Sequence, residues 1–336
     1  MATVGERRRS TGGSEVSLVE LAEDWLMAKE LASRSTSVNS TLARRRDLCR
    51  WGRAIRTGFG RPVDDTGRLS IETDLAGVRL SDLTVDNCLQ ALAVLRGSGK
   101  ASSTARALST WRGFCHWLTR RGFLKVDPTD DDLLTAPAVV ERLPRAFTAD
   151  EIDQLRSAAA DPPMSATGAW PTRDLMIVEL LAGSGCRVSE LCALQIGDVD
   201  RRHEHPILRL RHTKNGSERD VPLPTRILVV VDGHLAERVK AGPRQPLLVR
   251  VGGESMTRQD VDHILRRLCR AAGVTAPVGE MAHGFRHYYG TTMAIRAVPL
   301  PVIQQLLGHS DPRTSSIYTR VAATSLSNAL SHAGML

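Results

Sequence analysis

Basic side chains and one phenol gather near the C-terminal end of this sequence. His283, Arg286 and His287 are spaced i, i+3 and i+4, so they can share one face of a helix. His309 and Tyr318 follow. Arginine is a permanently charged donor that matches a phosphate, imidazole exchanges protons near neutral pH, and a phenol becomes nucleophilic when its anion is stabilised. Each residue alone would more often be packed or solvated. Together they predict a site that attacks a phosphodiester.

Two short helices are expected to position the later members of this set. The first begins near Pro301 and has an apolar stripe of helical period, and Gly308 is placed to end it. The second is expected to begin at a Ser310 or Asp311 cap, with Pro312 at its first position, and to present Tyr318. The residues of the apolar stripe are Val302, Ile303, Leu306 and Leu307.

Two further cations lie upstream. Arg187 follows a glycine turn near a predicted helix start, with Glu190 three residues later to hold its rotamer. Taken alone, this pair indicates a surface ion pair. Residues 207–223 predict a β-hairpin around Asn215-Gly216, which puts Lys214 at its tip. A lysine there is usually solvated, although it could reach a nucleic-acid groove or protonate a leaving oxygen.

These motifs, in this order, closely resemble the tyrosine recombinase (phage integrase) family. The resemblance covers the whole C-terminal part, and the N-terminal helices look like the family's core-binding domain. It implies a mainly α fold with a small β-sheet or hairpin, in which a helical bundle and an α+β catalytic domain form a C-shaped clamp on duplex DNA. The implied activity is site-specific cleavage and rejoining of DNA through a 3′-phosphotyrosine, without metal, ATP or other cofactor.

The resemblance also implies a role for each residue of the set. Tyr318 would be the nucleophile, and Arg187 and Arg286 would clamp the phosphate oxygens. His283 would act as general base or proton shuttle and Lys214 as general acid. The remaining roles are a phosphate hydrogen bond from His309 and support from Glu190 and His287.

Length and composition are compatible with this assignment. The chain has 336 residues, 42% of them hydrophobic, which suits two domains with sizeable cores, and its net charge of +8 favours a polyanionic partner. Its six cysteines include no Cys-x-x-Cys pair, so we expect reduced thiols and neither a disulfide framework nor a zinc site. The sequence contains no long apolar run and no signal peptide, so we expect a cytoplasmic, nucleoid-associated protein with no membrane contact.

The expected organisation is a disordered basic arm (1–14), a helical DNA-binding domain (15–136), a linker (137–145) and a catalytic domain (146–336) with a C-terminal docking helix. In the helical domain, residues 57–80 read as a loop. Basic residues on two of its amphipathic helices are candidates for DNA contact, with a solvated face as the alternative; they are Arg44, Arg45, Arg50, Arg106 and Arg112.

Three other functions compete with recombination. A type IB topoisomerase-like enzyme would share the chemistry, a non-catalytic protein on the same scaffold would only bind DNA, and a zinc hydrolase would need a third ligand beside His283 and His287. The family resemblance further implies assembly on two DNA sites, typically as a tetramer joined through the C-terminal helix, and accessory directionality factors. Neither follows from the residues alone.

Overall fold

The computed structural model describes residues 16–32, 38–60, 69–130, 132–138, 145–163, 168–202, 204–211, 218–238, 241–277, 281–308 and 318. The chain forms two compact units, Met1–Glu141 and Arg142–Leu336. The division falls inside the stretch 137–145 that the sequence suggests as a linker. The predicted arm (1–14) lies outside the described residues.

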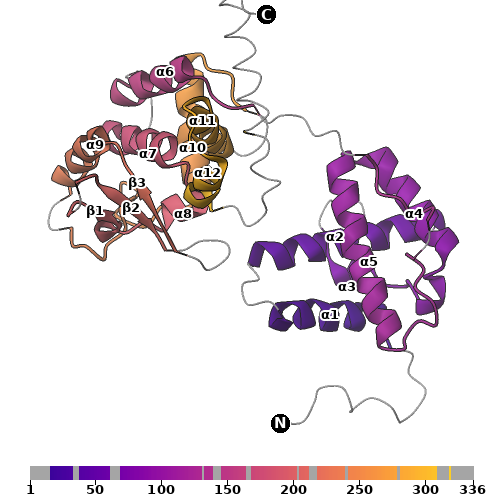
Figure 1. Cartoon of the computed structure of the whole chain (residues 1–336). Helices are drawn as coiled ribbons and strands as arrows, with labels where there is room; N and C mark the ends of the chain where they lie inside the picture. The colour runs from indigo at the N-terminus through magenta and orange to yellow at the C-terminus, as the bar shows by residue number, and fades with distance from the viewer. Residues whose placement is uncertain are drawn as a thin grey trace, which may run out of the picture. The chain divides into compact units, whose positions relative to one another are not determined.

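Unit 1 is a bundle of helices (Figure 1). The helix that begins at Ala101 has Lys100 at its N-cap position, and no side-chain hydrogen bond caps it. The elements of unit 1 are α1 (Leu18–Ala32), α2 (Val38–Gly58), α3 (Ile71–Asp74), the 3-10 helix η1 (Leu80–Asp82), α4 (Val85–Ser98) and α5 (Ala101–Arg120).

Helix α5 supplies the centre of the unit 1 core. Its apolar residues recur with helical period and form a buried face: Leu108, Trp111, Phe114, Cys115 and Leu118. The Trp111 ring stacks on Trp51 of α2, with centroids 5.3 Å apart and planes 7° from parallel. Phe114 packs against Trp25 of α1 at 5.6 Å. Aromatic packing therefore joins three helices that lie far apart in the sequence.

The expected loop at 57–80 is partly wrong. Helix α2 continues to Gly58, and α3 begins at Ile71, which is fully buried. Arg53 of α2 forms an ion pair with Asp74, a carboxylate that is itself buried. The sequence of this segment did not predict helix α3 for two reasons. The segment has few apolar residues, and its buried acid, Asp74, is paired with Arg53 of another helix. Residues 61–68 lie outside the described residues.

Unit 2 combines helices with a small sheet, as the sequence predicts (Figure 1). The three strands run antiparallel in the order β1-β2-β3. The elements are α6 (Ala149–Ala160), α7 (Pro171–Ser184), α8 (Val188–Cys192), η2 (Ile196–Asp198), β1 (Val199–Asp200), β2 (Ile207–Leu210), β3 (Arg219–Pro222), α9 (Thr225–Ala236), α10 (Arg258–Ala272), α11 (Met281–Ile295) and α12 (Leu300–Leu307).

Helix α7 occupies the middle of the unit 2 core. Its residues Met176 to Ala182 are all buried, and all of them except Glu179 are apolar. Helix α6 begins with a capping box, in which the Thr148 hydroxyl accepts a bond from the Glu151 N–H (3.2 Å) and the Glu151 carboxylate accepts one from the Thr148 N–H (3.0 Å). The two helices pack against each other.

The hairpin of unit 2 brings β3 to the functional residues. Leu208 pairs with Val221 and Leu210 with Arg219, so the predicted pairing of these two strands is confirmed. The turn itself, residues 212–217, lies outside the described residues. Within the described ranges, no helix is both long enough and apolar enough to span a membrane.

The aromatic stack of unit 1 gives a first prediction. Trp111→Ala should lower the free energy of unfolding of this unit by about 3–5 kcal/mol, because a fully buried indole is removed from its contact with Trp51. Tryptophan fluorescence in a denaturant titration measures the change. Leu31→Ala is the control: that side chain is 83% exposed, so stability should stay within about 0.5 kcal/mol. Equal losses in both variants would contradict the assigned core.

Candidate active site

The first arginine of the site lies at the junction of two helices. Gly185 ends α7 with a left-handed φ of 60°, and Arg187 is the N-cap residue of α8. The Glu190 carboxylate accepts one bond from the Arg187 backbone N–H and one from its guanidinium, both 2.8 Å long. The side chain of Glu190 is only 1% exposed and that of Arg187 is 23% exposed. The pair is therefore no surface ion pair: a buried carboxylate fixes a partly open arginine.

A second arginine, Arg219, donates hydrogen bonds to the same carboxylate, and the sequence analysis did not identify it. Arg219, the first residue of β3, donates to Glu190 Oε1 at 3.0 Å and to Oε2 at 2.7 Å. A signal was present: Arg219 alternates with the buried Val221 and Leu223, which puts it on the core face of the strand. A cation on that face requires an acidic partner.

Glu190 is held in its charged form by these two arginines. Burial alone would raise the pKa of its carboxyl, but the hydrogen bonds and charge of Arg219, together with the bonds from Arg187, outweigh burial and lower it. The carboxylate therefore stays ionised at neutral pH. It supplies one buried negative charge between two guanidiniums.

The third arginine, Arg286, lies on α11 and is almost completely buried. Its guanidinium donates to the carbonyl of Gly185 at 2.8 Å and to that of Leu307 at 2.5 Å. Burial and the nearby positive charges of Arg187 and Arg219 lower the pKa of Arg286 to about 10, so it is charged at neutral pH.

The C-terminal end of α12 contacts all three arginines, Arg187, Arg219 and Arg286, which together form the arginine cluster of the site. Gly308 ends this helix with a φ of 64°, as the sequence predicts, and the last carbonyl groups point to guanidiniums. A helix C-terminus carries partial negative charge, which suits cations. The contacts are Arg219 to the Leu306 carbonyl at 2.8 Å, Arg286 to that of Leu307 at 2.5 Å, and Arg187 to that of Gly308 at 3.0 Å.

The phenol of Tyr318 is buried against α11. Its side chain is 2% exposed, and its hydroxyl lies 3.4 Å from His287 Nδ1. A Cβ at Gly290 would come within 2.4 Å of the Tyr318 ring, so only glycine leaves room for the ring there. Burial raises the pKa of Tyr318, and the charge of Arg286 partly offsets this. A phosphate reaches this oxygen only if the tyrosine moves.

The two histidines of α11 differ in exposure. His283 is exposed and His287 half-buried, with ring centroids 6.4 Å apart, and both lie on the helix that carries Arg286, as predicted. Burial, followed by the influence of His283 and Arg286, lowers the pKa of His287 to about 4. This imidazole is therefore neutral at neutral pH and can accept a proton. Among the described residues, no group of three or more His, Cys, Asp or Glu is arranged to hold a metal ion.

Several predicted residues cannot be placed. Lys214 and His309 lie outside the described residues, as do the Ser310 or Asp311 cap and Pro312. The expected C-terminal docking helix, residues 322–336, is also outside them.

Most of the candidate DNA-contact arginines of unit 1 make contacts within that unit. Arg45 forms an ion pair with Glu23. Arg106 donates to both oxygens of the buried Asp47, at 3.0 and 2.9 Å. These contacts stabilise the bundle, and DNA binding by the five stays a prediction. The others are Arg50, whose guanidinium is 3.5 Å from the Ser103 carbonyl, Arg112, which donates to the Leu134 carbonyl, and Arg44, whose Nη1 is buried without a hydrogen-bond partner in the described part of the chain.

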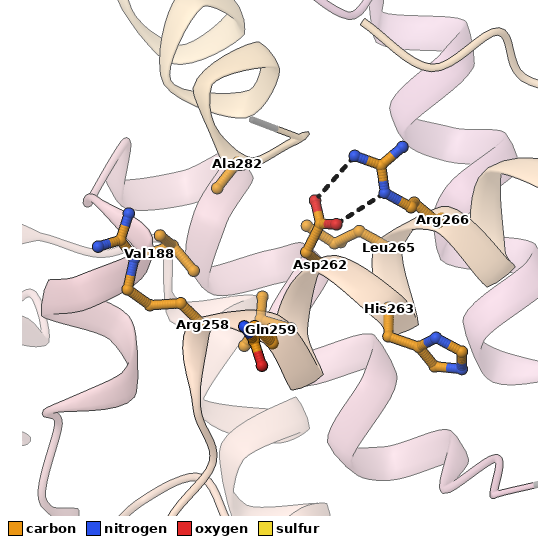
Figure 2. Close-up of a pocket in the computed structure, with 9 residues that line it drawn as sticks. Val188, Arg258, Gln259, Asp262, His263, Leu265, Arg266 and Ala282 are labelled. Carbon is orange, nitrogen blue, oxygen red and sulfur yellow. Dashed lines mark hydrogen bonds and ion pairs between the residues drawn. The ribbon is translucent and has the colours of Figure 1, made fainter. Parts of the chain in front are cut away.

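An open recess of about 580 Å³ is lined by residues of α8, α10 and α11. Figure 2 shows Val188 and Ala282 at one side of it, and Asp262 and Arg266 of α10 at the other. Val188 follows Arg187 in the sequence, and Ala282 precedes His283. Arg266 donates to Asp262 at 2.7 Å within this recess. The remaining lining residues of the recess are Arg258, Gln259, Val261, His263 and Leu265.

Comparison with known proteins identifies related sequences. The model of the phage integrase family matches residues 145–325. The chain is 33% identical to tyrosine recombinase XerD of Pseudomonas putida over 278 residues, which cover 79% of this chain and 89% of XerD. It is 33% identical to tyrosine recombinase XerC of Mycobacterium leprae over 260 residues, or 74% of this chain and 83% of XerC.

Solved structures share the fold. The XerH site-specific recombinase in its post-cleavage complex with difH substrate superposes with a TM-score of 0.65 at 17% identity, over 86% of this chain and 96% of XerH. A lambda integrase dimer bound to a COC′ core site gives a TM-score of 0.62 at 19% identity, over 91% of this chain and 77% of the integrase.

The packing of Tyr318 on Gly290 gives a second prediction. Gly290→Ala should displace the phenol from α11, because the new methyl group would overlap the ring. The freed phenol loses its desolvation, so its pKa should fall toward the ordinary value of about 10. Nitration by tetranitromethane, located by peptide mass spectrometry, should rise at Tyr318. Gly233→Ala is the control, since a Cβ there meets nothing within 4 Å. If Tyr318 is nitrated to the same extent in Gly290→Ala as in the wild-type protein, the packing of Tyr318 on Gly290 would be contradicted.

Proposed function

This chain belongs to the phage integrase family, the tyrosine recombinases, and we propose that it cleaves and rejoins DNA at specific sites through Tyr318. One observation carries the proposal: the Tyr318 hydroxyl contacts His287, and the adjacent Arg286 shares the end of α12 with Arg187. A nucleophile, an imidazole and two phosphate-binding cations thus belong to one unit.

The proposed reaction exchanges one phosphodiester for another. The Tyr318 oxygen attacks the scissile phosphorus while its proton passes to an imidazole, with His283 as general base or shuttle. The bond from phosphorus to the 5′-oxygen breaks, and Lys214 protonates that oxygen. A 3′-phosphotyrosine and a free 5′-hydroxyl result. The reverse attack by a 5′-hydroxyl of another strand completes exchange, with no net hydrolysis and no nucleotide consumed.

Stabilisation of charge on phosphorus is assigned to the arginines. Negative charge builds up on the phosphoryl oxygens in the transition state, and fixed cations already oriented toward them lower the barrier. Arg187 and Arg286, assisted by a hydrogen bond from His309, take the part that a divalent cation plays in many nucleases. This is our reason for proposing a reaction that is independent of metal and ATP.

In this proposal, DNA binding and DNA cleavage are separate steps, because Tyr318 is buried in the free protein. The raised pKa of the buried phenol makes attack unfavourable until Tyr318 leaves α11 and comes under the influence of the arginines. The neutral His287 contacts the resting hydroxyl of Tyr318, and removal of its proton is assigned to His283. DNA that reaches the arginine cluster would complete the site.

The partner is duplex DNA. The two units would close around it as a C-shaped clamp at the nucleoid, with the recess beside α10 receiving an edge of the duplex. Four protomers, joined through residues 322–336, would assemble on two sites, with accessory factors setting direction. Matches to recombinases and integrases, combined with a complete set of site residues, do not favour a topoisomerase or a non-catalytic binder. Relaxation of a plasmid that lacks a recombination site would favour the topoisomerase instead.

Covalent capture tests the proposed function. A DNA sequence that the wild-type protein binds is first selected from a randomised pool of duplexes. A duplex of that sequence that carries a nick should then form a covalent adduct with the wild-type protein. Tyr318→Phe should form none and should bind DNA as before, because only the nucleophilic oxygen is removed. Tyr288→Phe, which changes a neighbouring phenol of α11, is the control and should form the adduct. Binding without an adduct in the wild-type protein would support the non-catalytic alternative.

The role of Lys214 gives a separate prediction. Lys214→Ala should slow adduct formation by about 10²–10⁴-fold, since a general acid contributes that much. A substrate whose 5′-bridging oxygen is replaced by sulfur has a leaving group that needs no proton, so it should restore most of the rate. Arg187→Ala should lose about 10²–10³-fold on both substrates, because its contact is to the non-bridging oxygens. Equal loss on the two substrates in Lys214→Ala would exclude the acid role.

A further inference from the structure

Arg219 has no step in the proposed reaction, yet it is the most enclosed partner of Glu190. Its side chain is 8% exposed, against 23% for Arg187. A guanidinium in this position is costly to bury unless every donor is used. Its Nη1 and Nη2 donate to the two oxygens of Glu190, and its Nε donates to the Leu306 carbonyl.

The hydrogen bonds of Glu190 explain what Arg219 does for Arg187. An ionised carboxylate accepts about four hydrogen bonds. Arg187 supplies two of them, one to each oxygen, and Arg219 supplies the other two. Without Arg219, only the two bonds from Arg187 itself would hold the Glu190 carboxylate, so the carboxylate and the Arg187 guanidinium could shift together.

Arg219 also fixes the segment that holds the other two guanidiniums. A Cβ at Gly308 would lie 2.8 Å from Arg219 Nη1, so the end of α12 packs directly on this side chain. The carbonyls of Leu307 and Gly308, which bind Arg286 and Arg187, follow the Leu306 carbonyl that binds Arg219. Strand β3 is thereby joined to both phosphate-binding arginines.

We propose that Arg219 is a positioning residue for strand cleavage: by locking Glu190 and the end of α12, it sets the spacing of Arg187 and Arg286 toward a phosphate. This rests on the proposed function, in which those two residues bind the scissile phosphate. Lysine cannot replace it, because one ammonium cannot span two carboxylate oxygens and a carbonyl in fixed geometry.

A double-mutant cycle on the nicked duplex described above tests this role. Arg219→Met should slow single-turnover adduct formation by about 10-fold or more at saturating protein, with DNA affinity little changed. In an Arg187→Lys background, the guanidinium that Arg219 orients is already absent. There, Arg219→Met should slow adduct formation by about 3-fold or less. Arg219→Lys should recover only part of the rate. Equal losses in both backgrounds would overturn the proposal.

Arg156→Met is the matched control. Arg156 also donates to both oxygens of a buried glutamate, Glu179 at 2.7 and 3.2 Å, in the same unit but outside the arginine cluster. If loss of a buried ion pair acted only through general stability, this variant would slow cleavage as much as Arg219→Met. We expect its adduct rate to equal that of the wild-type protein.

A measurement without DNA separates failure of the inference from failure of the proposed function. In ¹H–¹⁵N spectra of the free full-length protein, the Arg187 Nε–H signal, assigned through Arg187→Lys, should shift and broaden in Arg219→Met and stay unchanged in Arg156→Met. An unchanged signal in Arg219→Met would overturn the positioning role whether or not the wild-type protein forms an adduct. Absence of an adduct in the wild-type protein, with the expected spectral change, would reject the proposed function alone.

Discussion

Mutual repulsion among three guanidiniums is the constraint on which this site depends. Burial, and after it the charges of Arg187 and Arg219, lower the pKa of Arg286, as such repulsion requires. One buried carboxylate and the negative end of α12 counter it. In the proposed function, cations assembled in this way are already oriented toward the non-bridging oxygens of a phosphodiester before DNA arrives, so little reorganisation remains at the moment of reaction.

The same contacts connect chemistry with conformation. The carbonyls that hold the arginines belong to the last turn of α12, and the chain leads from there toward Tyr318. The phenol itself rests over Gly290, beside a neutral imidazole. In the proposed function, Tyr318 must leave α11 before its hydroxyl can meet a phosphate at the arginines. A site of this kind can be complete in composition and still inactive in the free protein.

Local patterns in the sequence predicted the helix that ends at Gly308, the pairing of the hairpin strands and the Arg187–Glu190 contact, because each depends on residues that lie close together in the sequence. Contacts between residues that lie far apart in the sequence could not be predicted in this way. No local pattern around Arg106 indicates Asp47 as its partner, and none around Glu190 indicates Arg219. The α3 helix was missed for the same reason, since Asp74 depends on Arg53. Alternation along β3 was the one overlooked signal.

The internal ion pairs of unit 1 have a consequence for how tightly this protein would hold a polyanion as ionic strength changes. A cation releases condensed counterions from DNA only when it neutralises a phosphate. Arg45 and Arg106 are already neutralised by Glu23 and Asp47. A plot of log affinity against log salt should therefore be shallower than a count of basic residues on α2 and α5 implies, because arginines that are paired within the bundle would release no counterions from DNA.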